Sequence, residues 1–274
     1  SAIEVPVAQI KSVPALFGEV DVMKVLQLLP GVQSTGDGNA GIFVRGGNYD
    51  QNMITLDGST LYNADHLKGF VSCLNADVIQ NVVLYKGGFP ARFGSRLSSV
   101  IDVGIREGDY DYHHAGATIG VLSSKIHAEG PIEHGKSSFI FAARMSYLDF
   151  IVMPIIRKLA DNTGPLSSFS NMNYYDINAK LTRKFTDRDK ISAVFYLGND
   201  VAVTAPSDSR QKFFLELYNY NSLSYKSDRT ENSWGNMVSS MYWTRTINDQ
   251  MNSNVNLSYS HFQYRLKMNS VIEN

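Results

Sequence analysis

The side chains best suited to bind a ligand lie in residues 59–70, which hold an aromatic, an amide, an acidic, an imidazole and a basic group. These groups are Tyr62, Asn63, Asp65, His66 and Lys68. Aromatic and polar groups on a loop suit the recognition of a sugar, a peptide or a chelate. The same side chains could instead pack against the inner wall of a surrounding structure. The residue types alone favour neither alternative.

Other site chemistry is not supported by the spacing of residues. Gly46-Gly47 and the other glycine-rich stretches match neither the phosphate-binding pattern G-x-x-x-x-G-K-[ST] nor a strand-bounded G-x-G-x-x-G, so we expect these glycines in turns. No Ser/His/Asp arrangement stands out, and the sequence predicts no enzyme. His113 and His114 are adjacent and point to opposite faces of a strand, so they cannot hold one metal together. We therefore expect no catalytic residue, no metal and no cofactor.

Composition excludes several classes of protein. The formal charge of −1 argues against a nucleic-acid partner, which normally requires a basic surplus. The single cysteine, Cys73, excludes an intrachain disulfide and is expected to be a small buried hydrophobe. No apolar run approaches the roughly 20 residues of a membrane-spanning helix. Residues 1–10 lack the basic and apolar regions of a signal peptide, so we expect such upstream segments to lie outside this sequence.

Glycine and tyrosine divide the chain into two parts, with a boundary expected near residues 108–112. Residues 1–110 hold 14 of the 21 glycines, whereas residues 111–274 hold 11 of the 15 tyrosines. Helical spacing of apolar residues before Pro30-Gly31 predicts a helix over 19–29. Short apolar runs predict strands at 41–47, 52–57, 81–86 and 98–105. The first part is therefore expected to be an α+β domain, with an irregular segment over 58–74 that presents side chains.

Alternating polar and apolar residues predict about six antiparallel strands in the second part. They are expected at 114–128, 138–147, 174–185, 191–197, 233–247 and 251–259. Short turns at 131–135, 187–189 and 248–250 alternate with long polar connections at 151–173 and 201–232. This asymmetry is typical of an outer-membrane β-barrel, as are aromatic residues near strand ends such as Tyr174, Tyr175, Tyr242 and Trp243. A β-sandwich also alternates, but its strands are usually about 5–6 residues long, so the predicted strand length favours the barrel.

Seven segments in residues 14–100 resemble the plug domain of TonB-dependent outer-membrane receptors, in the subtype common in Bacteroidota. They are PALFGEVDVMK at 14–24, LQLLPGVQ at 26–33, VRGG at 44–47, DQN at 50–52, LDG at 56–58, YNADH at 62–66 and YKGGFPARFGSRLSSV at 85–100. Each segment alone is weak, but their order and spacing make the resemblance specific. The barrel-like second part supports it independently.

The resemblance implies an architecture and a function. Residues 1–110 would be a plug inside a barrel of 22 antiparallel strands, of which residues 111–274 supply about six, so we expect the rest of the barrel to lie outside this sequence. The TonB-ExbB-ExbD complex would supply the work of opening the plug, and a scarce or large ligand such as a siderophore, haem, glycan or peptide would pass inward. The protein would lie in the outer membrane, in contact with its lipid, and would not be an enzyme. A surface lipoprotein lid is a candidate partner in this subtype.

The resemblance also implies roles for particular residues. Ligand contacts are expected at plug positions facing outward, namely Arg45, Asn48, Tyr49, Tyr62, Asn63 and His66. Arg92 and Arg96 are expected to contact the barrel wall, and Arg45 could do the same. An alternative function stays open, because the sequence indicates a fold and no ligand. The chain could belong to a surface, assembly or signalling component that keeps the plug and barrel without transporting anything.

Overall fold

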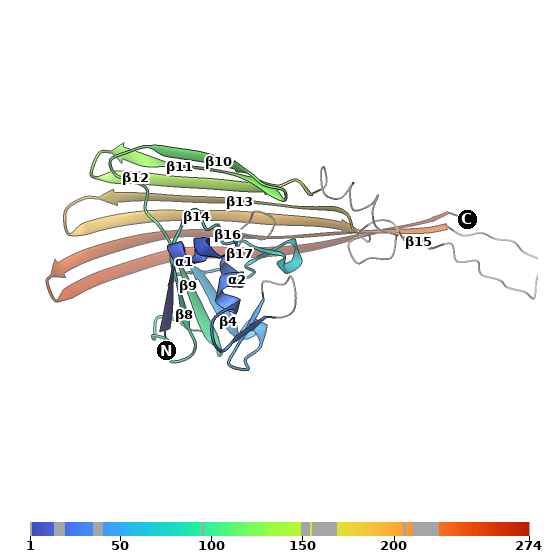
Figure 1. Cartoon of the computed structure of the whole chain (residues 1–274), viewed down its shortest axis with the longest axis horizontal. Coiled ribbons are helices and arrows are strands. Elements are labelled where there is room, and N and C mark those ends of the chain that lie inside the picture. The colour runs from blue at the N-terminus through green and yellow to red at the C-terminus, as the bar shows by residue number, and fades with distance from the viewer. Residues whose placement is uncertain are drawn as a thin grey trace, which may run out of the picture.

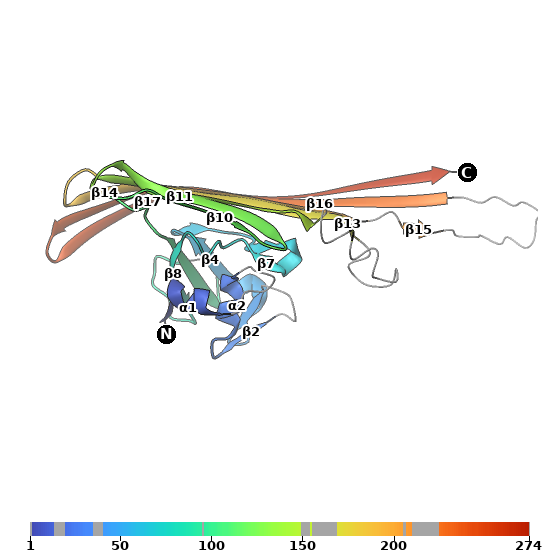
Figure 2. The same ribbon diagram turned by 45° about the horizontal axis from the view of Figure 1, so that its top comes forward.

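The computed structural model describes residues 2–13, 20–34, 41–94, 96–148, 154, 169–204, 207–209 and 225–273. Two parts follow one another along the chain. Residues up to Ile105 form a small globule, which we call the globule, and the strands from His114 onward form a long curved sheet, which we call the wall. The globule lies against one face of the wall (Figure 1), and the curvature of the wall is visible when the molecule is turned (Figure 2).

The globule is built on a five-stranded sheet with the order β1-β8-β9-β4-β5, in which only β4 and β9 are parallel among the described pairs. The bounds of these strands are β1 Ala2–Pro6, β4 Asn52–Leu56, β5 Ser59–Thr60, β8 Ile79–Tyr85 and β9 Ser99–Ile105. Two further strand pairs and four short helices complete it: β2 Val32–Ser34 with β3 Ile42–Val44, β6 Asp65–His66 with β7 Val71–Ser72, α1 Val7–Ser12, α2 Val22–Gln27, η1 Tyr49–Gln51 and η2 Leu67–Gly69. None of the helices described is long and apolar enough to cross a membrane.

The helix α2 shows how the sequence produces these elements. Val22 and Leu26 recur at helical spacing and are fully buried in the core of the globule. Asp21 caps the helix by accepting hydrogen bonds from the backbone N–H groups of Met23 and Lys24, at 2.9 and 3.3 Å. Pro30-Gly31 follows, with Gly31 at φ +77°, a conformation that ends a helix. The helix lies inside the predicted range of 19–29 but is shorter, because the cap fixes its start.

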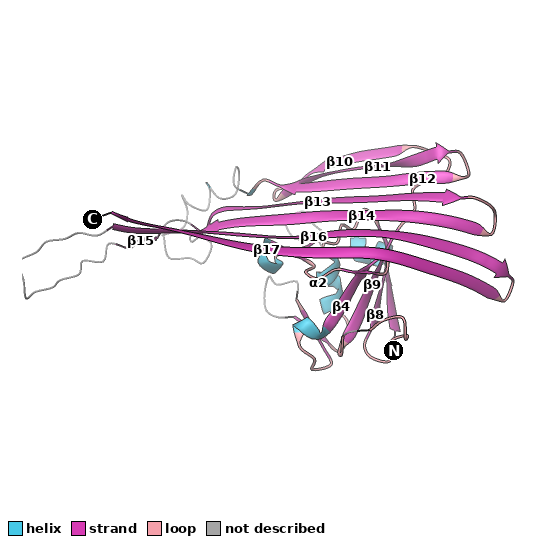
Figure 3. Cartoon of the chain, turned by 180° about the vertical axis from the view of Figure 1, so that it is seen from behind, coloured by secondary structure: helices cyan, strands magenta, loops and turns pink. Residues whose placement is uncertain are grey.

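The wall consists of long antiparallel strands joined to their neighbours in sequence, as the view from behind shows (Figure 3). Its strands are β10 His114–Ile119, β11 Ser123–Glu133, β12 Ser137–Ser146, β13 Phe169–Lys184, β14 Asp189–Thr204, β15 Ser207–Ser209, β16 Tyr225–Asn248 and β17 Met251–Glu273. Tight turns connect β11 to β12, β13 to β14 and β16 to β17, and we call that side the short-turn end. The opposite side, where β13 begins and β14 ends, is the long-loop end. The described sheet is open, with β10 and β17 at its edges.

Side chains alternate across the wall as the sequence predicts. On β13, Asp176 and Thr182 are buried on the face toward the globule, whereas Tyr175 and Leu181 are 42% and 51% exposed on the other face. The outward face of the wall carries many further exposed apolar side chains, among them Ile126, Met145, Met241, Val255 and Leu257. The described architecture is therefore an α+β globule followed by antiparallel strands that are polar toward the globule and apolar on the outside.

Three details of the predicted wall are wrong. Residues 114–128 form two strands, because the backbone N–H of Gly120 donates to the carbonyl of Ser123 and closes a tight turn where the sequence has no strong turn signal. The wall strands reach 24 residues, so residues 201–204 and 225–232 of the predicted long loop belong to strands. Tyr174 and Tyr242, both expected near a membrane surface, face the globule instead. Tyr174 is 2% exposed and shares the inward parity of Asp176, and Tyr242 lines the cavity beside Asp57 and Gly58.

Candidate functional site

Residues 59–72 contact the wall strands β13, β16 and β17, and we call them the 59–72 segment. The segment starts after the hairpin turn Asp57-Gly58, in which both residues have positive φ, +44° and +70°. It contains β5, β6, η2 and β7. Leu67 and Lys68 in η2 also have positive φ, so the chain reverses sharply beside the wall. Tight backbone turns thus bring His66 and Leu67 against the wall, while Ala64 packs in the core of the globule.

A buried cluster of charged groups joins this segment to three wall strands, and we call it the His66 network. The Nδ1 atom of His66 lies 2.7 Å from Oδ2 of Asp200, and its Nε2 atom lies 3.1 Å from Oδ2 of Asp176. Arg144, on β12, donates from Nε to the same oxygen of Asp176 at 2.8 Å. Asp200 also accepts the backbone N–H of Leu67 at 2.8 Å. All four members of the network are at most 3% exposed.

The His66 network is balanced in charge. Both ring nitrogens of His66 face carboxylates, so both must donate, and the imidazole must be protonated. Burial alone would lower the pKa of His66, but the hydrogen bonds to Asp176 and Asp200 outweigh it and raise the pKa above its usual value. One imidazolium and the Arg144 guanidinium then face two carboxylates. Such mutual compensation allows four charged groups to be buried together.

Further wall side chains hold the backbone of the 59–72 segment by its carbonyl groups. Trp234 donates from Nε1 to the carbonyl of Asp65 at 3.3 Å, and Arg144 donates to that of Ser72 at 2.9 Å. Asn236 and Ser260 donate to the carbonyls of Asn63 and Thr60 in the same way. Donors on β12, β16 and β17 therefore fix the course of the segment, together with the carboxylates of β13 and β14.

A second group of contacts joins the globule and residues 106–107, which follow it, to the wall, and we call it the ion-pair set. Its pairs are Lys180–Asp57 at 3.0 Å, Lys125–Asp77 at 2.9 Å, Lys190–Glu107 at 2.6 Å, and Arg106–Glu129. Burial raises the pKa of Asp57, and the neighbouring Lys180 ammonium opposes that rise. Lys125 is paired in register with Arg144 and so lies at the level of the His66 network, whereas the other three pairs lie nearer the short-turn end. The wall thus contacts the globule through one connected cluster and through separate ion pairs.

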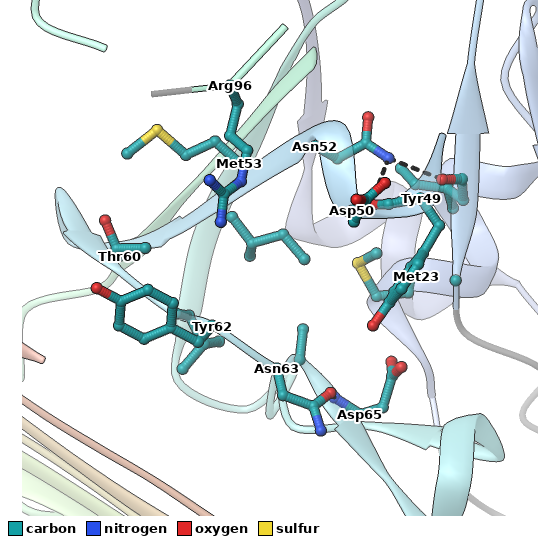
Figure 4. A pocket seen from close by; sticks show the side chains of 15 residues that line it. Met23, Tyr49, Asp50, Asn52, Met53, Thr60, Tyr62, Asn63, Asp65 and Arg96 are labelled. Carbon is teal, nitrogen blue, oxygen red and sulfur yellow. Dashed lines mark hydrogen bonds between the residues drawn. The ribbon is translucent and has the colours of Figure 1, made fainter. Parts of the chain in front are cut away.

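A pocket opens beside the 59–72 segment on the side of the long-loop end. It consists of two adjoining cavities of about 120 and 430 Å³ that share Tyr49, Asn63 and Asp65 in their linings, and we call it the interface pocket. The smaller cavity is also lined by Asp50, Tyr62 and Arg96, and the larger by Lys68, Asn232, Trp234 and Tyr264. Figure 4 shows the smaller cavity, with Tyr49 and Tyr62 on either side, Asn63 and Asp65 along one border, and Arg96 entering from the other.

The carboxylates in the interface pocket are unusual. Burial and the nearby charge of Asp21 raise the pKa of Asp65 to about 6. Burial and the charges of Asp65 and Asp50 raise the pKa of the Tyr49 hydroxyl, and all three residues line the smaller cavity. Among the described residues, no side chain or backbone group donates a hydrogen bond to the carboxylate of Asp65 or Asp50. Within the described part of the chain, the pocket therefore contains two carboxylates that accept no hydrogen bond.

The structure brings together three of the six residues expected to bind a ligand. Tyr49, Tyr62 and Asn63 line the interface pocket. Arg45 and Asn48 lie in the exposed turn that follows β3, outside the lining, where Arg45 has φ +50° and Asn48 caps η1 with Gln51. A ligand contact at these two positions stays a prediction.

His66 packs against the wall, which is the second of the two alternatives that the sequence left open for the side chains of residues 59–70. It is 2% exposed, and both of its nitrogens bond to wall carboxylates, so it packs against the wall and offers no group to a ligand. Arg92 pairs with Asp102 of the globule at 3.2 Å, and its described ion pair is thus internal. Arg96 lines the interface pocket. The expected contacts of Arg92 and Arg96 with the barrel wall stay predictions.

Several pocket residues were not foreseen from the sequence. Asp50, Asn232, Trp234 and Tyr264 all line the pocket, and the last three come from wall strands more than 150 residues away from Asn63 along the chain. Strand parity was the available signal, because even-numbered residues of β16 and β17 share the inward face. Nothing in the sequence indicates which inward residues meet the 59–72 segment, since that depends on how the globule docks.

Comparison with known proteins supports the first part of the resemblance. Residues 5–99, about a third of the chain, match the family model described as TonB-dependent Receptor Plug Domain. These residues cover the globule except for the first residues of β1 and nearly all of β9. The chain thus carries a plug-domain match followed by antiparallel strands. No curated protein sequence matches the chain.

Solved structures with a similar fold cover almost the whole chain. The siderophore receptor PirA from Pseudomonas aeruginosa matches with a TM-score of 0.51 and 12% identity, over 99% of this chain and 52% of that one. The copper transporter OprC gives a TM-score of 0.58 and 10% identity, over 97% and 47%. The alcaligin outer membrane receptor FauA from Bordetella pertussis gives 0.51 and 12%, over 99% and 48%. The chain therefore spans about half the length of these structures, and at such identities the likeness concerns the fold.

Proposed function

We propose that this chain is the plug and part of the barrel wall of an outer-membrane receptor that imports a ligand with energy from TonB. The observation that carries the proposal is a plug-domain match docked, through buried charged groups, on the polar face of a sheet whose other face is apolar. A polar inner face and an apolar outer face suit a barrel in the outer membrane. The similar folds include a siderophore receptor and a copper transporter, which favours import.

The proposal includes the division of the chain and its partners. Residues 1–110 would be the plug and residues 111–274 the first strands of the barrel, with TonB-ExbB-ExbD as the energy-transducing partner. The protein would have no enzymatic activity. The Bacteroidota subtype, and with it a surface lipoprotein lid, rests on the sequence motifs of residues 14–100 alone. The ligand would bind in the interface pocket, with Arg45 and Asn48 as further contacts on the exposed turn.

Fractionation and TonB binding test this function in the full-length protein. We expect it in the outer-membrane fraction, and we expect the purified protein to bind the isolated periplasmic domain of TonB from the same cell. A porin of the same membrane serves as the control that should not bind. Outer-membrane location without TonB binding would favour the alternative of a non-transporting surface component. A location outside the outer membrane would overturn both.

A further inference from the structure

The charges around the interface pocket restrict the ligand that it can take. The lining holds two carboxylates, those of Asp50 and Asp65, and two cationic side chains, those of Lys68 and Arg96. Their formal charges balance, so an anionic ligand gains no net electrostatic attraction from the pocket. A metal ion is also disfavoured, because the described residues contain no group of three or more His, Cys, Asp or Glu side chains placed to hold one. A ligand rich in hydrogen-bond donors fits best.

Aromatic rings around the same space favour a ligand with apolar faces as well as donors. Tyr49, Tyr62 and Tyr264 are 53%, 56% and 58% exposed, so their rings are available for contact. Rings of this kind combine an apolar face with a polar hydroxyl. The amides of Asn63 and Asn232 can both donate and accept. Sugars match this combination, because a pyranose ring has C–H faces that lie on aromatic rings and hydroxyls that both donate and accept.

We propose that the interface pocket binds a neutral carbohydrate, with Asp65 accepting hydrogen bonds from ligand hydroxyls and Tyr49 and Tyr62 contacting the sugar faces. The inference rests on the proposed function and specifies the class of its ligand. Asp65 is well placed for this role, since Trp234 holds its backbone carbonyl and the Asn63 side chain accepts its N–H at 3.1 Å. Its partly buried carboxylate accepts no hydrogen bond from the residues that the structure describes, and the ligand supplies a donor.

A second cavity between the globule and the wall agrees with a neutral ligand. It has a volume of about 660 Å³ and lies toward the short-turn end, beside β14, β16 and β17. Its lining includes six charged groups that pair with one another, namely Asp57 with Lys180, Asp102 with Arg92, and Glu107 with Lys190. A neutral sugar that reached this cavity would meet polar groups and would leave the three ion pairs intact.

Calorimetric titration of the purified full-length protein in detergent tests the proposal without requiring transport. The probes are neutral oligosaccharides of glucose, mannose, galactose and xylose, a ferric tris-catecholate as the anionic chelate, and spermine as the polycation. We expect at least one oligosaccharide to bind and the ferric chelate not to bind. Asp65→Asn and Tyr62→Ala should each weaken sugar binding about ten- to hundredfold. Binding should also weaken as the pH falls through about 6, where Asp65 takes up a proton.

Matched controls separate the pocket from general effects. Asp111→Asn and Tyr112→Ala change the same residue types at exposed positions outside the pocket and should leave sugar binding unchanged. Binding of spermine or the ferric chelate in place of every oligosaccharide would overturn the proposal, as would a complete lack of sugar binding. Equal loss in the control variants would also overturn it. TonB binding is measured separately, so the ligand class can fail while the proposed receptor function stands.

Discussion

The two sets of charged contacts between the globule and the wall, the His66 network and the ion-pair set, differ in burial and in connectivity. The members of the His66 network are 0–3% exposed and share hydrogen bonds, so that Asp176 alone bonds to both His66 and Arg144. The pairs of the ion-pair set lie apart from one another and are more exposed, with Lys190 at 39% and Glu107 at 28%. A connected buried cluster is expected to form and break as a unit, whereas separate pairs near solvent can exchange one at a time.

The difference indicates which contacts decide whether the globule stays docked. Removing one member of a buried cluster leaves a charge without a partner and costs several kcal/mol. An exposed pair contributes about 0–1 kcal/mol. The His66 network should therefore dominate docking, while the ion-pair set orients the globule. Four predictions test this ranking, each in the full-length protein by hydrogen exchange of residues 60–75 and by urea denaturation of the plug.

The largest effect is expected for Arg144→Met. The change removes the guanidinium that Asp176 bonds at 2.8 Å and leaves a buried carboxylate with His66 as its remaining cation. Docking should weaken by about 3–5 kcal/mol, with faster exchange in residues 60–75. The double variant with Asp176→Asn should recover part of the loss, because the unpaired charge is then absent. Equal stability of Arg144→Met and the unchanged protein would show that the network does not hold the globule.

The next effect is a dependence of docking on pH through His66. Its pKa is raised in the docked state above about 6.5, the usual value in the undocked state. Protonation thus favours docking fully below about pH 6.5, and the stabilisation is lost as the pH rises through the raised pKa. Asp176, Asp200, Arg144 and the stacked Tyr174 are the groups around it. Docking should weaken as the pH rises above about 6.5 and through the raised pKa, and His66→Gln should remove this slope; a slope that persists would contradict the assignment.

Lys180→Met should have an intermediate effect. Lys180 and Asp57 are only 10% and 12% exposed, and Lys180 also donates to the carbonyl of Ile105 at 2.6 Å. Loss of the ammonium leaves the carboxylate of Asp57 partly buried, and its already raised pKa should rise further. We expect a loss of about 1–3 kcal/mol, with faster exchange near residues 57–58 and little change in residues 65–72. A change spread evenly over both regions would mean that the two sets of contacts are coupled.

The smallest effect is expected for Lys190→Ala. Its partner Glu107 has a lowered pKa because the hydrogen bond and charge of Lys190, with the Tyr110 hydroxyl, outweigh burial. Both groups of the pair are more than a quarter exposed, so water replaces much of what is lost. Docking should change by less than about 1 kcal/mol, and salt should screen most of the difference. A loss comparable to that of Arg144→Met would reverse the ranking of the two sets of contacts.

Local patterns in the sequence were sufficient to predict most helices and strands of the fold. The predicted strands at 52–57 and 98–105 are β4 and β9 to within one residue, since short apolar runs between glycines and polar residues have few other conformations. The inward and outward faces of β13 and β14 also follow from alternation. The turn at residues 120–122 was missed, because Gly120 is followed by Val121 and Leu122, which carry no turn signal.

The candidate site was only half predictable. Tyr62 and Asn63 were identified because polar and aromatic groups gather in one irregular stretch of the globule, and Tyr49 was identified through the resemblance to the plug domain. Trp234 and Tyr264 looked like ordinary inward residues of strands, since their role depends on contacts with a segment about 170 or more positions earlier in the chain. The sequence also could not decide whether His66 binds a ligand or packs against the wall. A histidine in a polar loop has the same sequence signature whether it faces solvent or carboxylates.

The sequence by itself determined the two parts of this protein, the α+β character of the globule and the alternation of the wall, because these depend on local propensity and on the period of apolar residues. Only the tertiary structure decided that Asp176, Asp200 and Arg144 meet His66 and that Asp65 is left facing a pocket. The physical reason is that burial and charge compensation are properties of pairs of surfaces. They exist only once the globule has docked on the wall.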